Sequence, residues 1–91
     1  MSSYKKIVNK LIDQFITISI AESFTGGEIS RKFISVPGVS QIFNMGLITY
    51  SNQAKHLILK IPLFSIKKYG AVSEEIAFLM SKNLSKISKS D

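Results

Sequence analysis

Apolar residues near the start of the chain recur at the spacing of a helix. They lie three and four positions apart, at Tyr4, Ile7, Val8, Leu11, Ile12 and Phe15. This spacing puts them on one face of a helix, while lysines and Asp13 fall on the other faces. The pattern predicts an amphipathic helix over about residues 4–15 that packs its apolar face against the rest of the protein.

The following segment changes from helical spacing to alternation. Residues 16–21 are mostly β-branched or small, which predicts a strand of about six residues. A turn at 22–27 contains Gly26 and Gly27 and separates this strand from a short helix with Ile29 and Phe33 on its apolar side. Pro37-Gly38 ends that helix, so a strand, a glycine-containing turn and a helix follow in order.

A second apolar run, from Phe43 to Tyr50, predicts another strand, with Gly46 inside it. Ser51 or Asn52 is suited to cap the helix that follows, and Pro62 breaks that helix. A short helix or turn then leads to Gly70, a suitable helix-terminating residue.

Ser73 is the predicted N-cap of the last helix, and Glu74 and Glu75 stand in its first turn, where negative charge opposes the helix dipole. The polar tail from Lys86 to Asp91 is expected to fray.

These elements predict an α/β fold. Two strands joined by a helical crossover are normally parallel, and a parallel sheet has both faces covered by helices. Two strands are too few for a stable sheet. Further strands are therefore expected, either from a longer chain or from a partner subunit.

Composition narrows the function classes. The chain has 91 residues, no cysteine and one histidine, which disfavours a disulfide framework and a metal site. The net charge is +6, but the lysines are scattered along the chain and do not form a nucleic-acid-binding stripe. With no signal peptide and no membrane-spanning run recognised, the sequence predicts a cytoplasmic protein without a membrane partner.

Ser23 is the first candidate for chemistry, because it leaves the first strand at the carboxyl end, where parallel sheets bind ligands. The helix that begins near Thr25, Gly26 and Gly27 would direct free N–H groups to the same place, for a phosphate or an oxyanion. The alternative is purely structural: Ser23 or Thr25 caps the helix, and the glycines form a tight turn.

Lys55 is the second candidate, since it follows the second strand by about one helical turn and so falls at the same edge of the sheet. A desolvated lysine can act as the base that activates a serine. Tyr50, at the strand end, could orient the pair or be an ordinary aromatic residue. Glu22 could pair with Lys55, bind substrate or cap a turn. Gly46 indicates close approach by a ligand or another backbone segment.

Several stretches in this order resemble the motifs of one family. Residues 21–27, AESFTGG, are similar to the A-E-S-x-T-G-G signature of the CinA C-terminal domain family, and VPGVS follows at 36–40. GLITYSNQAK at 46–55 is similar to the family's G-x-x-T-Y-S-N-x-A-K, and GAVSEE at 70–75 to its G-A-V-S-E. The resemblance covers about residues 4–85, so residues 1–91 are expected to form part of one such domain.

The resemblance implies a three-layer α/β/α sandwich, of which this chain would be the incomplete front half. Family enzymes include nicotinamide-nucleotide amidases of the PncC type, which hydrolyse the carboxamide of nicotinamide mononucleotide to the acid and ammonia. In that chemistry Ser23 would attack the amide carbon, Lys55 would be its base and Tyr50 would lie close by. The turn at 25–27 would offer backbone donors to the nucleotide, and neither a metal nor a cofactor is implied.

Family domains are longer than this chain, which leaves a second hypothesis open. The chain could be an inactive or split remnant that associates with itself or with a second chain that supplies the other half. The expected partners are therefore a small nucleotide substrate and either further copies or a complementing chain.

Overall fold

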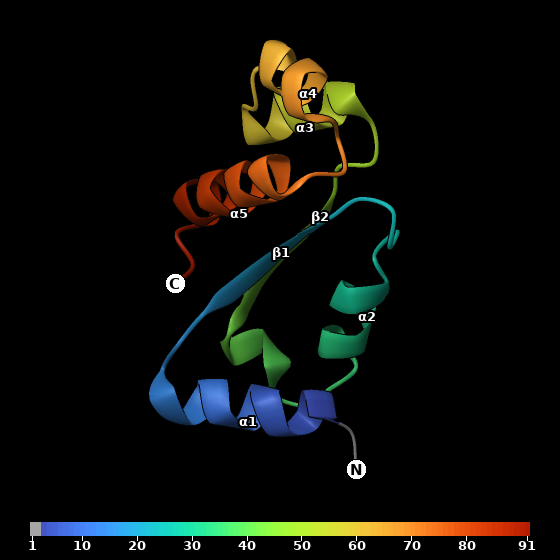
Figure 1. Ribbon diagram of the computed structural model, residues 1–91. Coiled ribbons are helices and arrows are strands. Elements are labelled where there is room, and N and C mark those ends of the chain that lie inside the picture. The colour runs from blue at the N-terminus through green and yellow to red at the C-terminus, as the bar shows by residue number, and fades with distance from the viewer. Residues whose placement is uncertain (1–2) are drawn as a thin grey trace.

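The computed structural model describes residues 3–91, which form a two-stranded sheet set between helices (Figure 1). The elements follow in the order α1 Ser3–Gln14, β1 Ile18–Glu22, α2 Glu28–Ile34, the 3-10 helix η1 Val39–Gln41, β2 Phe43–Ile48, α3 Asn52–Leu59, α4 Leu63–Tyr69 and α5 Glu74–Ser88. The predicted α/β class is confirmed, and the elements follow the predicted order; the segment expected to be a short helix or turn is the helix α4, and η1 is an addition. No helix within residues 3–91 is long and apolar enough to cross a membrane.

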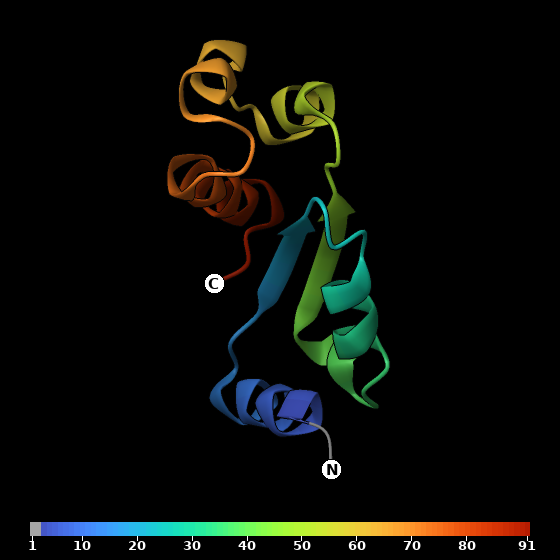
Figure 2. The same cartoon turned by 45° about the vertical axis from the view of Figure 1, so that its right-hand side comes forward.

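The two strands are parallel and adjacent. Ala21 is paired with Leu47 and Glu22 with Ile48, whereas the register shifts by one residue near the start of β1. α2 and α5 lie on opposite sides of this small sheet (Figure 2). The chain therefore forms the helix, sheet and helix layers of an α/β/α sandwich.

The core consists of two apolar clusters on either side of the sheet. One cluster joins α3, α4 and α5 to the strands and contains Leu59, Ile61, Ile66, Ile76 and Leu84, with Ala21, Met45 and Leu47 packed against it. The other joins α1 and α2 at the beginning of the strands and contains Val8, Val36, Val39 and Ile42. The first cluster packs against the strands near their carboxyl ends, where the site is built, and the second holds their beginnings.

The predicted helix boundaries are formed by local capping. The Ser51 hydroxyl accepts a hydrogen bond from the Ala54 N–H, and the Ser73 hydroxyl accepts one from the Ile76 N–H. Each therefore satisfies a backbone donor that the first helical turn leaves without a partner. Pro62 directly precedes α4, and Gly70 ends it.

Two expectations about the ends of helices were wrong. Phe15 does not join the apolar face of α1; it adopts a left-handed conformation with φ of 57° and is 89 % exposed. The tail does not fray throughout either, because Lys86 belongs to α5, Ser90 is buried and Asp91 hydrogen-bonds to Thr17. Tertiary contacts with β1 hold this polar segment, and sequence periodicity cannot reveal them.

Candidate active site

The structure brings Ser23 and Lys55 together. Ser23 directly follows β1, and Lys55 lies in the first half of α3, shortly after β2. Because the strands are parallel, both side chains reach the same edge of the sheet, where Lys55 Nζ lies 3.0 Å from Ser23 Oγ. This distance is that of a hydrogen bond.

The amine of Lys55 is enclosed by backbone oxygens. Its side chain is 1 % exposed, and Nζ donates hydrogen bonds to the carbonyls of Thr49, at 3.0 Å, and Tyr50, at 3.3 Å. Burial lowers the pKa of Lys55 below its ordinary value of 10.5, because the charged form loses hydration. A neutral amine has two N–H bonds and one lone pair, so the two carbonyls can take the N–H groups while the lone pair faces Ser23.

Tyr50 contributes to this arrangement through its main chain. Its carbonyl contacts Lys55, but its side chain is 73 % exposed. The structure thus gives the backbone at Tyr50 a definite part in holding Lys55. A catalytic role for the phenol stays a prediction.

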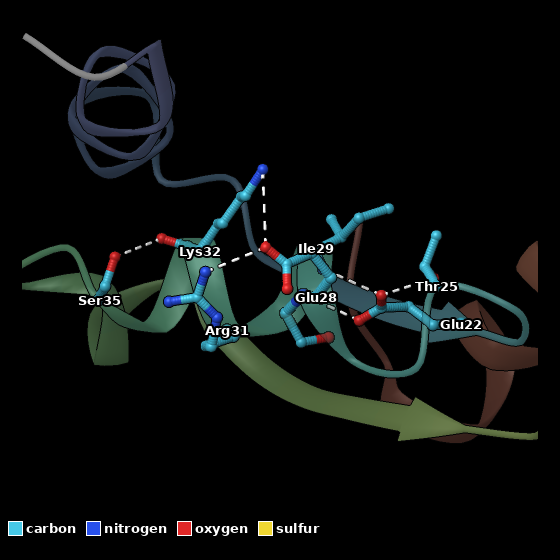
Figure 3. Close-up of polar contacts among 8 residues, drawn as sticks. Glu22, Thr25, Glu28, Ile29, Arg31, Lys32 and Ser35 are labelled. Atoms are coloured by element: carbon cyan, nitrogen blue, oxygen red, sulfur yellow. Dashed lines mark hydrogen bonds and ion pairs between the residues drawn. The ribbon is translucent and has the colours of Figure 1, made fainter.

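Glu22 points to the other face of the sheet, toward α2 (Figure 3). Its carboxylate accepts hydrogen bonds from the N–H groups of Ile29 and Ser30, at 3.0 and 2.8 Å, and from the hydroxyl of Thr25, at 2.7 Å. Burial raises the pKa of Glu22, but these bonds from Ser30, Thr25 and Ile29 outweigh it and lower the pKa to about 2 from 4.5. Glu22 is therefore an ionised cap of α2.

This cap changes two expectations about the turn. The N–H groups of Ile29 and Ser30 at the start of α2 do not face the site as free donors, because the carboxylate of Glu22 binds them. Glu22 also does not pair with Lys55, because its carboxylate is bound by groups of α2 and the turn before it, whereas Lys55 Nζ contacts Ser23 and two backbone carbonyls. Alternation along β1 indicates this orientation, but no short motif reveals the contact with α2.

The two glycines of the turn are needed for backbone reasons. Gly27 precedes α2 with φ of 96°, and a Cβ atom there would lie 2.8 Å from Ile48 Cδ1. Gly26 has φ of 63° and open space around it, so its conformation rather than packing favours glycine. Ligand binding by this turn stays a prediction.

Gly46 lies against a helix, which accounts for its place inside β2. A Cβ atom at this position would come within 2.7 Å of Ser30 Oγ, a side-chain atom of α2. The strand glycine thus marks a close approach, but by a side chain of α2 and not by a ligand or another backbone segment as predicted. The predicted contact of Gly46 with substrate is untested, and helix packing is sufficient to explain the glycine.

A cleft of about 300 Å³ opens beside Ser23. Its walls come from the β1–α2 turn and from the loop before α5, and they include Phe24, Thr25, Val72 and Ser73. Phe24 and Val72 are 79 % and 88 % exposed, so the rim is apolar while the hydroxyl of Ser23 supplies a polar group. Sequence reasoning missed the rim, although the glycine-bounded loop at 70–73 was a signal for it.

The arrangement suits nucleophilic chemistry better than metal binding. Among residues 3–91, no three His, Cys, Asp or Glu side chains are grouped so as to hold a metal ion. His56 Nδ1 lies 2.8 Å from the Ile61 carbonyl, which gives it a structural contact at the end of α3. A hydroxyl next to a buried amine is the arrangement of a serine–lysine nucleophile.

Comparison with solved structures identifies close relatives of this fold. A CinA superfamily protein from Escherichia coli superposes with a TM-score of 0.93 at 27 % identity, over 97 % of this chain and 51 % of that chain. A competence or damage-inducible protein from Enterobacter asburiae gives a TM-score of 0.93 at 30 % identity, over 97 % and 55 % of the respective chains. The chain thus corresponds to about half of each solved relative.

Sequence comparison gives the same family. A putative competence-damage inducible protein of Acetivibrio thermocellus is 47 % identical over 81 residues, which are 89 % of this chain and 20 % of the relative. A protein of the same description from Alkaliphilus oremlandii is 47 % identical over 85 residues, 92 % of this chain and 21 % of the relative. The model of the CinA C-terminal domain matches residues 1–91. The chain, which spans about a fifth of the length of these curated relatives, belongs to the CinA C-terminal domain family.

Proposed function

We propose that this chain carries the nucleophile and base of an amidohydrolase that acts on the carboxamide of nicotinamide mononucleotide. The observation that carries the proposal is the 3.0 Å contact between the buried amine of Lys55 and the hydroxyl of Ser23. The substrate rests on the motif resemblance, and the absence of cysteine fits a cytoplasmic setting.

The proposed reaction has two steps. In the first, neutral Lys55 takes the proton of Ser23 Oγ, and the oxygen attacks the carboxamide carbon to form a tetrahedral intermediate. The intermediate collapses to an ester on Ser23, and the ammonium of Lys55 returns a proton to the leaving nitrogen, which departs as ammonia. In the second, Lys55 takes a proton from water, whose oxygen attacks the ester, and Ser23 recovers its proton as the carboxylic acid leaves.

The surroundings of Lys55 support both protonation states that this cycle needs. As an ammonium it has three donors, which match the oxygens of Ser23, Thr49 and Tyr50. As an amine it keeps both carbonyl contacts and turns its lone pair to Ser23. Moving the proton therefore requires little rearrangement of the buried side chain.

The test is ammonia and nicotinate mononucleotide release from nicotinamide mononucleotide. The release is measured for the chain alone and for the chain mixed with the part of the Escherichia coli relative that it does not cover. The Ser23→Ala and Lys55→Ala variants are measured in the same two settings. We expect both variants to lose turnover by at least about 100-fold while they keep the circular dichroism spectrum of the parent. Turnover that survives Ser23→Ala would refute the serine mechanism, and a parent inactive in both settings would refute the proposed activity.

A further inference from the structure

Phe24 is a large aromatic side chain that stands largely exposed beside the nucleophile. It directly follows Ser23 in the β1–α2 turn and lines the cleft of about 300 Å³ at that serine. The turn itself is held by its backbone, since the Gly26 N–H donates to the Ser23 carbonyl. Within residues 3–91 the ring of Phe24 belongs to neither apolar cluster of the core. Packing of the described chain therefore does not account for an aromatic residue at this position.

The other wall of the cleft is apolar as well. Val72, in the loop between α4 and α5, is exposed at the rim, and Ala71 beside it packs against the cluster of α3, α4 and α5. Met80 of α5 adds a partly buried apolar side chain. An aromatic face on one wall and aliphatic groups on the other suit a flat ring placed between them.

The charges around the cleft suit a cation. Among the described residues that line it, Glu22 is the only ionisable one, and its carboxylate is the ionised cap of α2. Lys55 lies next to Ser23, but it is neutral when it acts as the base of the proposed reaction. A positively charged ring in the cleft would therefore meet an aromatic face and a nearby carboxylate rather than a second cation.

We propose that Phe24 is a specificity-determining residue that stacks on a pyridinium ring, so that the cleft selects planar, positively charged aromatic carboxamides. This inference rests on the proposed function, because it identifies the residue that holds the ring of the substrate. In nicotinamide mononucleotide the carboxamide carbon is bonded directly to a pyridinium ring. When that carbon lies about 3–3.5 Å from Ser23 Oγ, ready for attack, the ring must lie in the cleft beside it.

The aromatic character of Phe24 matters more than its apolar bulk. The face of a phenyl ring carries partial negative charge and attracts a cation placed over it, which an aliphatic side chain of similar size does not do. Phe24 is the only aromatic residue among the described residues that line the cleft. Its substitution should therefore change ring binding, and should change the chemical step at Ser23 little.

Direct contact with the ring can be observed by fluorescence, because the chain contains no tryptophan. Phe24→Trp, in a Ser23→Ala background that does not consume the ligand, places one fluorophore at the cleft. A stacked pyridinium ring quenches indole emission, because electron transfer from the excited indole competes with emission. We expect quenching by nicotinamide mononucleotide that saturates, and none by ribose 5-phosphate, which lacks the ring.

Phe64→Trp in the same background is the matched control. Phe64 is an exposed phenylalanine of α4 that does not line the cleft, so its emission should fall only in proportion to ligand concentration. Both variants are measured alone and mixed with the part of the Escherichia coli relative that the chain does not cover. In the mixture, the emission of the same mixture without the added tryptophan is subtracted.

Steady-state kinetics then separates the aromatic face from apolar bulk. Phe24→Leu keeps an apolar side chain but removes the aromatic face, and we expect KM for nicotinamide mononucleotide to rise by about fivefold to 30-fold while kcat stays within about threefold. Phe24→Tyr keeps the face and should change each constant by less than about threefold. Phe64→Leu should change neither. Because both phenylalanines are exposed, these variants should keep the circular dichroism spectrum of the parent.

The inference would be overturned if Phe24→Trp emission fell only as that of the Phe64→Trp control does, or if Phe24→Leu left KM of an active parent unchanged. An effect of Phe24→Leu on association with the uncovered part of the relative, without saturable quenching, would also overturn it and assign the ring to that contact. Failure of the proposed function looks different. Saturable quenching beside a parent without turnover would refute hydrolysis and retain the ring contact, whereas turnover without such quenching would refute the ring contact alone.

Discussion

The Nζ atom of Lys55 lies 3.0 Å from the Oγ atom of Ser23, although 32 positions separate the two residues in the chain. Two parallel strands bring them together, because Ser23 follows the carboxyl end of β1 and Lys55 lies in the helix that follows the carboxyl end of β2. The other hydrogen-bond partners of the amine are two backbone carbonyls, and burial lowers the pKa of Lys55.

Replacing Lys55 with methionine separates its chemical role from its packing role. Lys55→Met keeps a long unbranched side chain in the core but removes the base, and we expect turnover to fall by about 10²–10⁴-fold. Unfolding free energy should change by less than about 2 kcal/mol, because relief from burying the amine offsets the lost carbonyl contacts. Ammonia release and urea denaturation measure the two effects, and a variant with near-parental turnover would exclude Lys55 as the base.

A rise in pH should increase both the turnover and the unfolding free energy through Lys55. Its pKa in the folded chain is below 10.5, so the neutral amine and with it kcat/KM should increase as pH rises toward that lowered pKa. Between the folded and the unfolded pKa, the unfolded chain binds more protons at this residue, so unfolding free energy also rises with pH. The Lys55→Met variant should lack this part of the stability profile; an unchanged profile would contradict the lowered pKa.

Tyr50 supplies a carbonyl to Lys55, while its phenol is largely exposed. If the main chain makes the only necessary contribution, Tyr50→Phe should keep turnover within about threefold of the parent, because the substitution leaves the carbonyl in place. Steady-state kinetics with nicotinamide mononucleotide measures this. A loss of kcat beyond about 100-fold with unchanged KM would instead assign the phenol a part in the chemistry.

Glu22 should make the fold sensitive to acid. With a pKa of about 2 in the folded chain and 4.5 ordinarily, it contributes its full stabilisation above pH 4.5 and loses it as pH falls toward 2. Glu22→Gln should lower the unfolding free energy at neutral pH by about 1–3 kcal/mol and flatten the dependence in this interval, because an amide cannot accept from all three donors.

Glu28→Gln is the matched control for Glu22, since Glu28 is an exposed carboxylate paired with Arg31 and Lys32 on the surface of α2. We expect it to leave the acid profile nearly unchanged, as surface pairs contribute little. Denaturant titrations between pH 2 and 7 compare the three proteins. Equal effects of the two substitutions would mean that Glu22 stabilises the chain no more than the surface ion pairs of Glu28 do.

The contact of Gly46 with Ser30 predicts a coupled pair. Gly46→Ala places a methyl group 2.7 Å from Ser30 Oγ, and we expect it to cost about 1–3 kcal/mol of unfolding free energy. Ser30→Ala alone should leave the unfolding free energy nearly unchanged. In the double variant it should recover part of the cost of Gly46→Ala, because it removes the oxygen that the new methyl group would crowd. A double-mutant cycle measures the coupling, and strictly additive effects would show that the helix moves away instead.

Local sequence was sufficient to predict the helices and strands. Ser51 and Ser73 cap helices as predicted, and Pro62 and Gly70 interrupt them, because these effects depend on a few neighbouring residues. The parallel order of the strands followed from the helical crossover, and with it the meeting of Ser23 and Lys55 at one edge. Such inferences need only chain connectivity and the periods of helix and strand.

Other features depended on contacts between distant segments. The exposure of Phe15, the docking of Asp91 on Thr17 and the burial of Glu22 against α2 contradict or refine what the local pattern indicated. Gly46 carries no sign of its partner, since only the packed sheet brings Ser30 above it. The sequence by itself thus determined the order of elements and the edge where the chemistry gathers. Only the tertiary structure decided the partner of each buried polar group, because desolvation makes pairing obligatory there and packing chooses among the available partners.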